Sequence, residues 1–125
     1  MSDDTALVGF RDDVEAGWQH LLKPGYRHCW CAVNIDDTWI EVDGGPRVPR
    51  LRVSSGDLPA FYRTQPIRFL VGPYLSDWPK SPLIRRDCVG MVKAVLGIRS
   101  WAVTPWQLYR ALEARGWTSG HSPTA

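Results

Sequence analysis

The chain lacks several features that would place it quickly in a class. It has 125 residues but only three cysteines, and Cys29 and Cys31 stand too close together for a comfortable disulfide. A disulfide framework is therefore not expected, and reduced thiols fit a cytoplasmic protein. The acidic N-terminus is not that of a secretory signal, and no run approaches the roughly 20 apolar residues of a membrane helix. We therefore expect a protein of the cytoplasm, or one released by lysis, that makes no membrane contact.

The chain also has little net charge and no repeated segments. The formal net charge is only +2, which is too small to indicate nucleic acid as a partner. There are no repeats and no low-complexity tract. What the chain has in quantity is tryptophan, seven residues that will dominate either the core or a binding face. The length fits one domain spanning residues 1–125, with residues 1–8 and 118–125 expected as flexible tails.

Hydrophobic patterning predicts an α+β fold. Apolar residues at helical spacing predict a first helix from about Phe10 to Leu22. Alternation predicts strands over residues 28–34 and 38–43, joined as a hairpin by the turn residues Asp36 and Asp37. Further strands are expected over residues 47–54, at an edge because of Pro49, and over residues 67–71, with a short helix over residues 58–63 between them. Together these elements predict a mostly antiparallel sheet packed on helices.

Two helices are expected after the sheet, and the first of them carries a cysteine in its first turn. Asp87 is a suitable N-cap for a helix over residues 88–96, and Gly97 is a suitable end. A second helix follows, with Thr104 as its N-cap. A helix N-terminus carries partial positive charge and free N–H groups, which favour a thiolate at Cys88 and could hold an oxyanion. Arg85 and Arg86 add positive charge before the helix.

A thiol nucleophile needs a base, and His28 is the best candidate. With Asp36 and Asp37 at the tip of the hairpin, Ala32 pairs with Glu41, and Asp43 lies diagonally next to His28 on one face. Asp43 is thus the first candidate to orient the imidazole, and Glu41 is the second. A slip of one residue in the turn would move both acids to the other face.

The remaining chemistry-bearing residues suggest structural roles. Cys29 and Cys31 project from the strand face opposite His28, so we expect them in the core. The same alternation argues against a zinc site made by His28, Cys29, Cys31 and Cys88, and we expect no metal and no cofactor. Arg47, Arg50 and Arg52 form a basic strip that is most simply a solvated edge strand, with an anionic substrate or partner as the weaker alternative.

These pieces resemble the circularly permuted papain-like enzymes, which are related to the NlpC-type cell-wall peptidases and the lecithin-retinol acyltransferase group. The resemblance rests on Gly25-Tyr-Arg-His28-Cys-Trp and on Asp87-Cys88-Val-Gly-Met-Val-Lys-Ala-Val-Leu-Gly-Ile98 followed by Thr104-Pro105-Trp-Gln-Leu108. The same pieces look similar to small proteins of tailed phages. The resemblance implies Cys88 as the nucleophile, His28 as the base, and Asp43 or Glu41 as the orienting residue.

The function that the resemblance implies is a cysteine-dependent amidase, peptidase or acyltransferase working through a thioester. Its substrate would be a peptide or peptidoglycan, and a phage source would add structural proteins of the virion as partners and the host cytoplasm or the virion as location. The alternative is a non-catalytic interaction or virion-assembly protein on the same fold, which binds a partner through Trp78, Tyr74, Trp101 and Trp106. Nucleic-acid binding through Arg47, Arg50, Arg52 and Arg68 ranks last.

Overall fold

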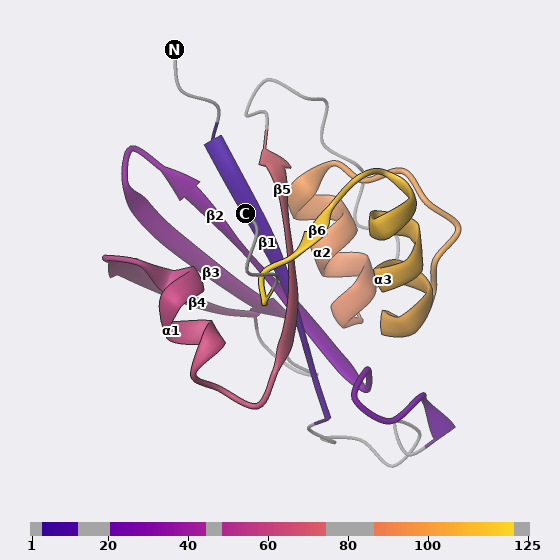
Figure 1. Cartoon of the computed structure of the whole chain (residues 1–125). Helices are drawn as coiled ribbons and strands as arrows, with labels where there is room; N and C mark the ends of the chain where they lie inside the picture. Colours follow the sequence, from indigo (N-terminus) through magenta and orange to yellow (C-terminus); the bar gives the residue numbers. More distant parts are fainter. Residues whose placement is uncertain (1–3, 13–20, 45–48, 75–86, 122–125) are drawn as a thin grey trace.

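The computed structural model describes residues 4–12, 21–44, 49–74 and 87–121. In this part of the chain six antiparallel strands form one sheet, in the order β4-β3-β2-β1-β5-β6 (Figure 1). The strands are β1 (Asp4–Arg11), β2 (His28–Ile35), β3 (Thr38–Gly44), β4 (Pro49–Ser55), β5 (Arg68–Tyr74) and β6 (Thr118–Ser119). The helices are α1 (Leu58–Arg63), α2 (Cys88–Leu96) and α3 (Pro105–Ala114). The expected α+β class with an antiparallel sheet is confirmed.

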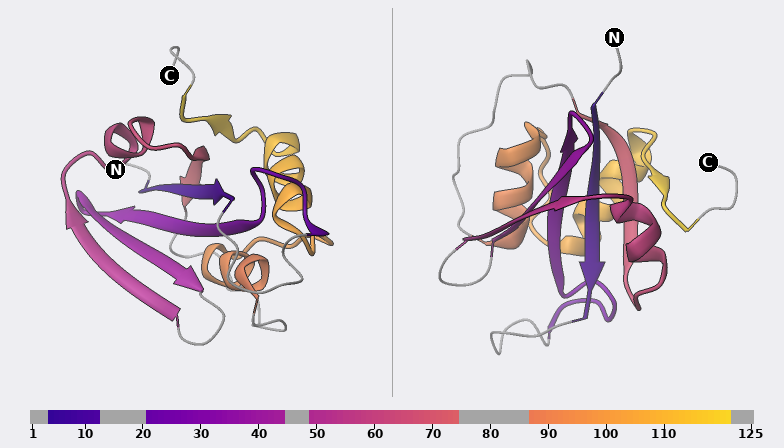
Figure 2. Two further views of the ribbon diagram at one scale, coloured as in Figure 1. Left: turned by 90° about the horizontal axis from the view of Figure 1, so that it is seen from below. Right: turned by 90° about the vertical axis from the view of Figure 1, so that its left-hand side faces the viewer.

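Helices cover both faces of the sheet. Helices α2 and α3 lie on one face and α1 on the other, as Figure 2 shows edge-on. Alternate residues of the central strands β1 and β2 therefore enter two separate hydrophobic clusters. Cys29, Cys31 and Phe10 belong to the larger cluster under α2 and α3, whereas Trp30 and Leu7 belong to the smaller one under α1. The alternation expected for this strand is confirmed, and it places Cys29 on the α2 side.

The β2–β3 hairpin has the register that its turn residues predict. Asp36 and Asp37 both have positive φ, 52° and 63°, as a two-residue hairpin turn of type I′ requires. Ala32 pairs with Glu41. The strand β4 is the other neighbour of β3 and the outermost strand of the described sheet, and it pairs Arg50 with Asp43. The edge position expected from Pro49 is confirmed.

The N-terminal segment differs from the expectation. Phe10 and Arg11, the predicted start of a helix, are the last residues of β1, and residues 4–8, expected in a flexible tail, belong to the same strand. This strand lies between β2 and β5, with Ala6, Leu7 and Val8 fully buried. Its apolar run is continuous because both of its faces are covered. Residues 13–20, the rest of the predicted helix, lie outside the described residues.

The C-terminal segment differs from the expectation, whereas the helix ends agree with it. The expected tail from residue 118 instead begins with β6, which pairs with β5, while residues 122–125 lie outside the described part. The predicted N-caps Asp87 and Thr104 each accept a hydrogen bond from a first-turn N–H. Asp57 does the same at the start of α1. In the described residues we find no helix with the length and apolarity needed to cross a bilayer.

Candidate active site

Helix α2 presents Cys88 at its first position. The Asp87 carboxylate accepts a hydrogen bond of 2.7 Å from the N–H of Gly90, and Gly97 ends the helix with a left-handed φ of 68°. The capped end fixes the first turn, whose remaining N–H groups have no carbonyl partner within the helix. Cys88 is 7% exposed and packs in the cluster between α2 and the sheet. Its predicted place at a capped helix start is confirmed, whereas Arg85 and Arg86 lie outside the described residues.

His28 lies at the first position of β2, on the strand against which α2 packs most extensively. It is the one buried side chain of charged type among the described residues, at 2% exposed. Its Nε2 lies 2.7 Å from Oδ1 of Asp43, and the Cys88 thiol is one of the groups that raise the pKa of His28. Since Nε2 is bonded to Asp43, Nδ1 is the nitrogen that remains for Cys88. The expected contact of His28 with Asp43 is therefore present.

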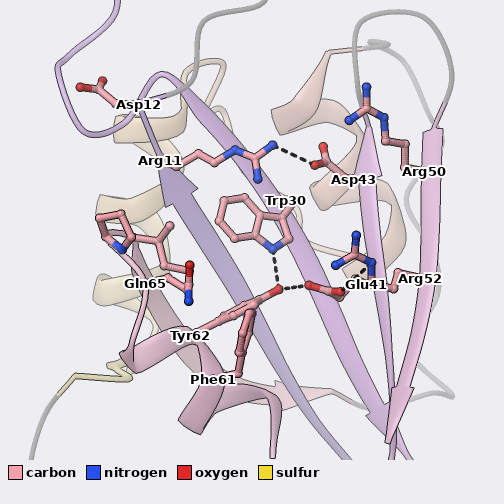
Figure 3. Close-up of a pocket in the computed structure, with 12 residues that line it drawn as sticks. Arg11, Asp12, Trp30, Glu41, Asp43, Arg50, Arg52, Phe61, Tyr62 and Gln65 are labelled. Carbon is pink, nitrogen blue, oxygen red and sulfur yellow. Dashed lines mark hydrogen bonds and ion pairs between the residues drawn. The ribbon is translucent and has the colours of Figure 1, made fainter.

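Asp43 is held in place from a second direction. Its Oδ2 accepts a hydrogen bond of 3.2 Å from the guanidinium of Arg11, which itself lies over the Trp30 ring at 4.8 Å from the ring centroid (Figure 3). One carboxylate oxygen thus binds the imidazole and the other binds an arginine. Burial would raise the pKa of Asp43, but its hydrogen bond to His28 and the positive charges nearby hold that pKa below its usual value. Asp43 therefore stays ionised beside the ring.

The electrostatics of the pair favour a charged thiolate and a charged imidazole. A hydrogen bond from the Cys29 thiol is the largest cause that lowers the pKa of Cys88 to about 5; burial opposes it, and the hydrogen bond and charge of His28 reinforce it. Burial alone would lower the pKa of His28, but the hydrogen bonds to Asp43 and Cys88 outweigh it and raise that pKa to about 9. At neutral pH the two groups form a thiolate–imidazolium ion pair, the reactive state of a thiol nucleophile.

Glu41 does not take part in this contact. It accepts a hydrogen bond from the hydroxyl of Tyr62, which in turn accepts a hydrogen bond of 2.8 Å from Nε1 of Trp30. Arg52 lies 3.9 Å from its other oxygen. The choice between the two acids, open at the level of the hairpin, is resolved in geometry: Asp43 contacts His28, and Glu41 belongs to a polar network under α1.

The network around Glu41 borders a pocket of about 630 Å³ on the α1 face of the sheet (Figure 3). The carboxylate of Asp43 lies on its wall, so the same side chain contacts the imidazole and the pocket. Arg50 and Arg52 line this pocket from β4, and Arg47 lies outside the described residues. The basic strip therefore faces the two acids of β3 across the strand pair, at Asp43 and Glu41.

One residue of the site escaped the sequence reasoning. Cys29 was assigned to the core, where it is fully buried, but it is also the largest cause that lowers the pKa of Cys88. Burial and Cys88 raise the pKa of Cys29 far above its usual value, so it remains a thiol and can donate. The available signal was its position next to His28. Strand alternation places the two on opposite faces, yet Cys88 lies on the face of Cys29 and still reaches His28 at the end of the strand.

Neither the metal site nor the tryptophan surface is assembled in the described part of the chain. No group of three or more His, Cys, Asp or Glu side chains among the described residues could hold a metal ion. Of the four aromatic residues proposed for a binding loop, Tyr74 is buried in the core and Trp106 stacks on Tyr109. Trp101 is 99% exposed, and Trp78 lies outside the described residues.

Comparisons with known proteins do not assign the chain to a family: no family model, no curated protein and no solved structure matches it. The candidate site therefore rests on its own geometry.

Proposed function

We propose that the protein is a cysteine-dependent hydrolase of amide bonds, with Cys88 as the nucleophile, His28 as the acid and base, and Asp43 as the residue that orients the imidazole. The observation that carries the proposal is the buried His28 ring, which Asp43 holds at 2.7 Å and whose pKa is raised in part by the Cys88 thiol at the start of α2. The order of these groups along the chain, and the packing of the cysteine helix on the two strands that carry the histidine and the acid, support a permuted papain-like arrangement.

The reaction follows from the protonation states. The Cys88 thiolate attacks the carbonyl carbon of the substrate, and the resulting oxyanion is stabilised by first-turn N–H groups of α2. Imidazolium His28 donates its proton to the leaving amine, and a thioester of Cys88 remains. Neutral His28 then takes a proton from water, whose oxygen attacks the thioester. The acid product leaves, and the thiolate–imidazolium pair is restored.

The substrate class we propose is a peptide or the peptide part of peptidoglycan, on the strength of the resemblance alone. A phage origin would make virion proteins possible partners and the host cytoplasm or the virion the place of action. The alternative of a non-catalytic binding protein has one observation in its favour, the fully exposed indole of Trp101. We rank it second because nothing in a binding role requires a buried histidine between a thiol and a carboxylate.

The first test is selective alkylation at neutral pH. Iodoacetamide should label Cys88 much faster than Cys29 or Cys31, because only Cys88 is a thiolate. Peptide mapping by mass spectrometry resolves the three sites, and equal labelling of all three would remove the basis for a nucleophile.

The second test is hydrolysis of peptide amides and peptidoglycan fragments. Cys88→Ala should lower any detected kcat/KM by at least about 10³-fold, while Cys31→Ala, which removes a buried thiol of β2 from the same cluster, serves as the matched control.

A further inference from the structure

The pocket on the α1 face of the sheet has no role in the proposed hydrolysis, apart from the carboxylate of Asp43 on its wall. Its volume of about 630 Å³ falls in the size range of sites that bind small molecules. The nucleophile belongs to the opposite face, since Cys88 packs in the cluster under α2 (Figure 2). A molecule bound in this pocket would therefore leave the thiol accessible to its own substrate.

Two of the three acids that line the pocket are already bound by close donors. Asp43 uses one oxygen for Nε2 of His28, at 2.7 Å, and the other for the guanidinium of Arg11, at 3.2 Å. Glu41 accepts a hydrogen bond from the hydroxyl of Tyr62, a residue that is only 3% exposed. The negative charges of both acids are thus compensated from within the protein.

The third acid is bound as well, whereas the two arginines of β4 have no close partner in the described part of the chain. Oδ1 of Asp12 accepts hydrogen bonds from a backbone N–H at 2.8 Å and from Arg27 at 3.2 Å. Arg52 approaches a carboxylate only to 3.9 Å, and Arg50 faces Asp43 in the ladder without forming an ion pair. The pocket therefore has two guanidinium groups that can bind an anion from outside.

The opposite wall of the pocket supplies an apolar surface. Phe61 of α1 and Ile67 line it, and Phe61 is 56% exposed although it is a large apolar residue. Arg50 and Arg52 stand two residues apart on one face of β4, about 7 Å along the strand, so their long side chains can reach one carboxylate. Figure 3 shows the arginines on the β4 side of the pocket and Phe61 on the α1 side.

We propose that this pocket binds a small molecule in which a carboxylate is joined to an apolar side chain or ring. Arg50 and Arg52 hold the carboxylate, and Phe61 contacts the apolar part. A single negative charge fits better than the double charge of a phosphate, because Glu41 and Asp43 lie on the same wall and repel the second charge. The inference does not depend on the proposed hydrolysis.

The experiment is a titration of the whole protein with N-acetylphenylalanine, followed in two-dimensional ¹⁵N–¹H NMR spectra. The signals of Phe61 and Arg52 should shift and saturate with a Kd of about 1 mM, as expected for a ligand of this size. N-acetylphenylalaninamide lacks the charge and N-acetylglycine lacks the ring, so each should bind at least about 10-fold more weakly. The tripeptide Ala-Ala-Phe tests the source of the carboxylate: equal affinity indicates peptide ends as ligands, and weaker binding indicates free acids.

Three variants locate the probe. Arg52→Gln should weaken binding by about 10-fold, whereas Arg110→Gln, a change of the same charge at a similarly exposed arginine of α3, should leave the Kd unchanged. Phe61→Ala should lower the affinity for N-acetylphenylalanine and leave that for N-acetylglycine as it is. Cys88→Ala should bind the probe as the wild type does. Because Arg52 and Arg110 are exposed, their substitution should not impair folding, which circular dichroism checks.

Four results would overturn the inference. The first is the absence of a saturable shift up to roughly 20 mM probe, and the second is equal binding of the acid and its amide. The third is competition by inorganic phosphate at the same concentration, which would show a general anion site. The fourth is loss of binding in Cys88→Ala, which would place the probe at the thiol. Binding without any hydrolysis would reject the proposed function alone, and hydrolysis without binding would reject this inference alone.

Discussion

At the scale of single residues, His28 interacts with two acidic groups, the thiol of Cys88 and the carboxylate of Asp43. The ring stabilises a thiolate on one side through its charge and is itself stabilised by a carboxylate on the other. The arrangement explains why a histidine that is almost fully buried can remain protonated, since burial alone would favour its neutral form. The reactivity of Cys88 therefore depends on neighbours as much as on its own position at a helix start.

The pH dependence of alkylation tests this reading of the ion pair. A thiolate exists above its pKa, so the rate of alkylation of Cys88 should rise as pH increases through about 5 and then stay level through neutral pH. In His28→Gln the midpoint should move toward the ordinary thiol value of about 8.5. Rates measured with iodoacetamide from pH 4 to 9 provide the profile. A wild-type midpoint near the ordinary value would contradict the ion pair.

Neutralising Asp43 and neutralising Glu41 should have different effects on the reactivity of Cys88. Asp43→Asn removes the charge beside the imidazole, so it should lower kcat by roughly 10²-fold and shift the alkylation midpoint of Cys88 upward. Glu41→Gln is the matched change on the same strand. It should leave the midpoint unchanged, because Glu41 is bonded to Tyr62 and not to His28. The same effect of both substitutions on the midpoint would show that the acids act through overall charge.

At the scale of elements, β1 and β2 pair so that Gly9 faces Trp30. A Cβ at position 9 would lie 2.3 Å from the indole, which no real contact allows. The ring is fixed there by its hydrogen bond to Tyr62 and lies 6.3 Å from the His28 ring, centroid to centroid. The glycine therefore gives the indole its place beside the site.

Gly9→Ala should consequently destabilise the protein by about 1–3 kcal/mol, the usual cost of overpacking. It should also disturb the Trp30 indole, so the intrinsic fluorescence should change in the folded state. Ser55→Ala, an exposed substitution on β4, is the control and should alter stability by less than about 0.5 kcal/mol. Urea unfolding measures both variants. Wild-type stability in Gly9→Ala would mean that the indole can move without cost.

Some elements of the fold can be predicted from the sequence, and others cannot. The hairpin, its register, the three helix caps and the diagonal contact of Asp43 with His28 all follow from local rules, because a two-residue turn fixes every pair in the ladder. The strand β1 did not follow, since a strand buried on both faces has no alternation and its apolar run can be mistaken for part of a helix. The role of Cys29 could not follow either, because it depends on where α2 docks across the sheet.

At the scale of the whole molecule, the ion pair couples folding to pH. The raised pKa of His28 gives stability that is complete below its unfolded value of 6.5 and is lost as pH rises through about 9. The lowered pKa of Cys88 gives stability that is complete above its unfolded value of 9.0 and is lost as pH falls through about 5. Between about 5 and 6.5 the folded pair therefore holds one proton and the unfolded pair two, whereas between 6.5 and 9 each state holds one.

The free energy of unfolding should thus rise with pH from about 5 to 6.5 and then change little up to 9 as far as this pair is concerned. The double variant His28→Gln with Cys88→Ala should lose that rise while it keeps the contributions of all other groups. Urea unfolding at a series of pH values, with wild type and double variant side by side, gives the difference. A difference that does not vary with pH would contradict the linkage.

The order of the site along the chain has a consequence for how the protein is made. His28 and Asp43 leave the ribosome long before Cys88, and the thiol gains its acidity only when α2 docks on β2. A nascent chain therefore carries an ordinary cysteine, which is a much weaker nucleophile than the thiolate of the folded protein. The reactive thiolate arises only late in biosynthesis, when the strands that tune it are already in place, and this timing protects the growing polypeptide from its own chemistry.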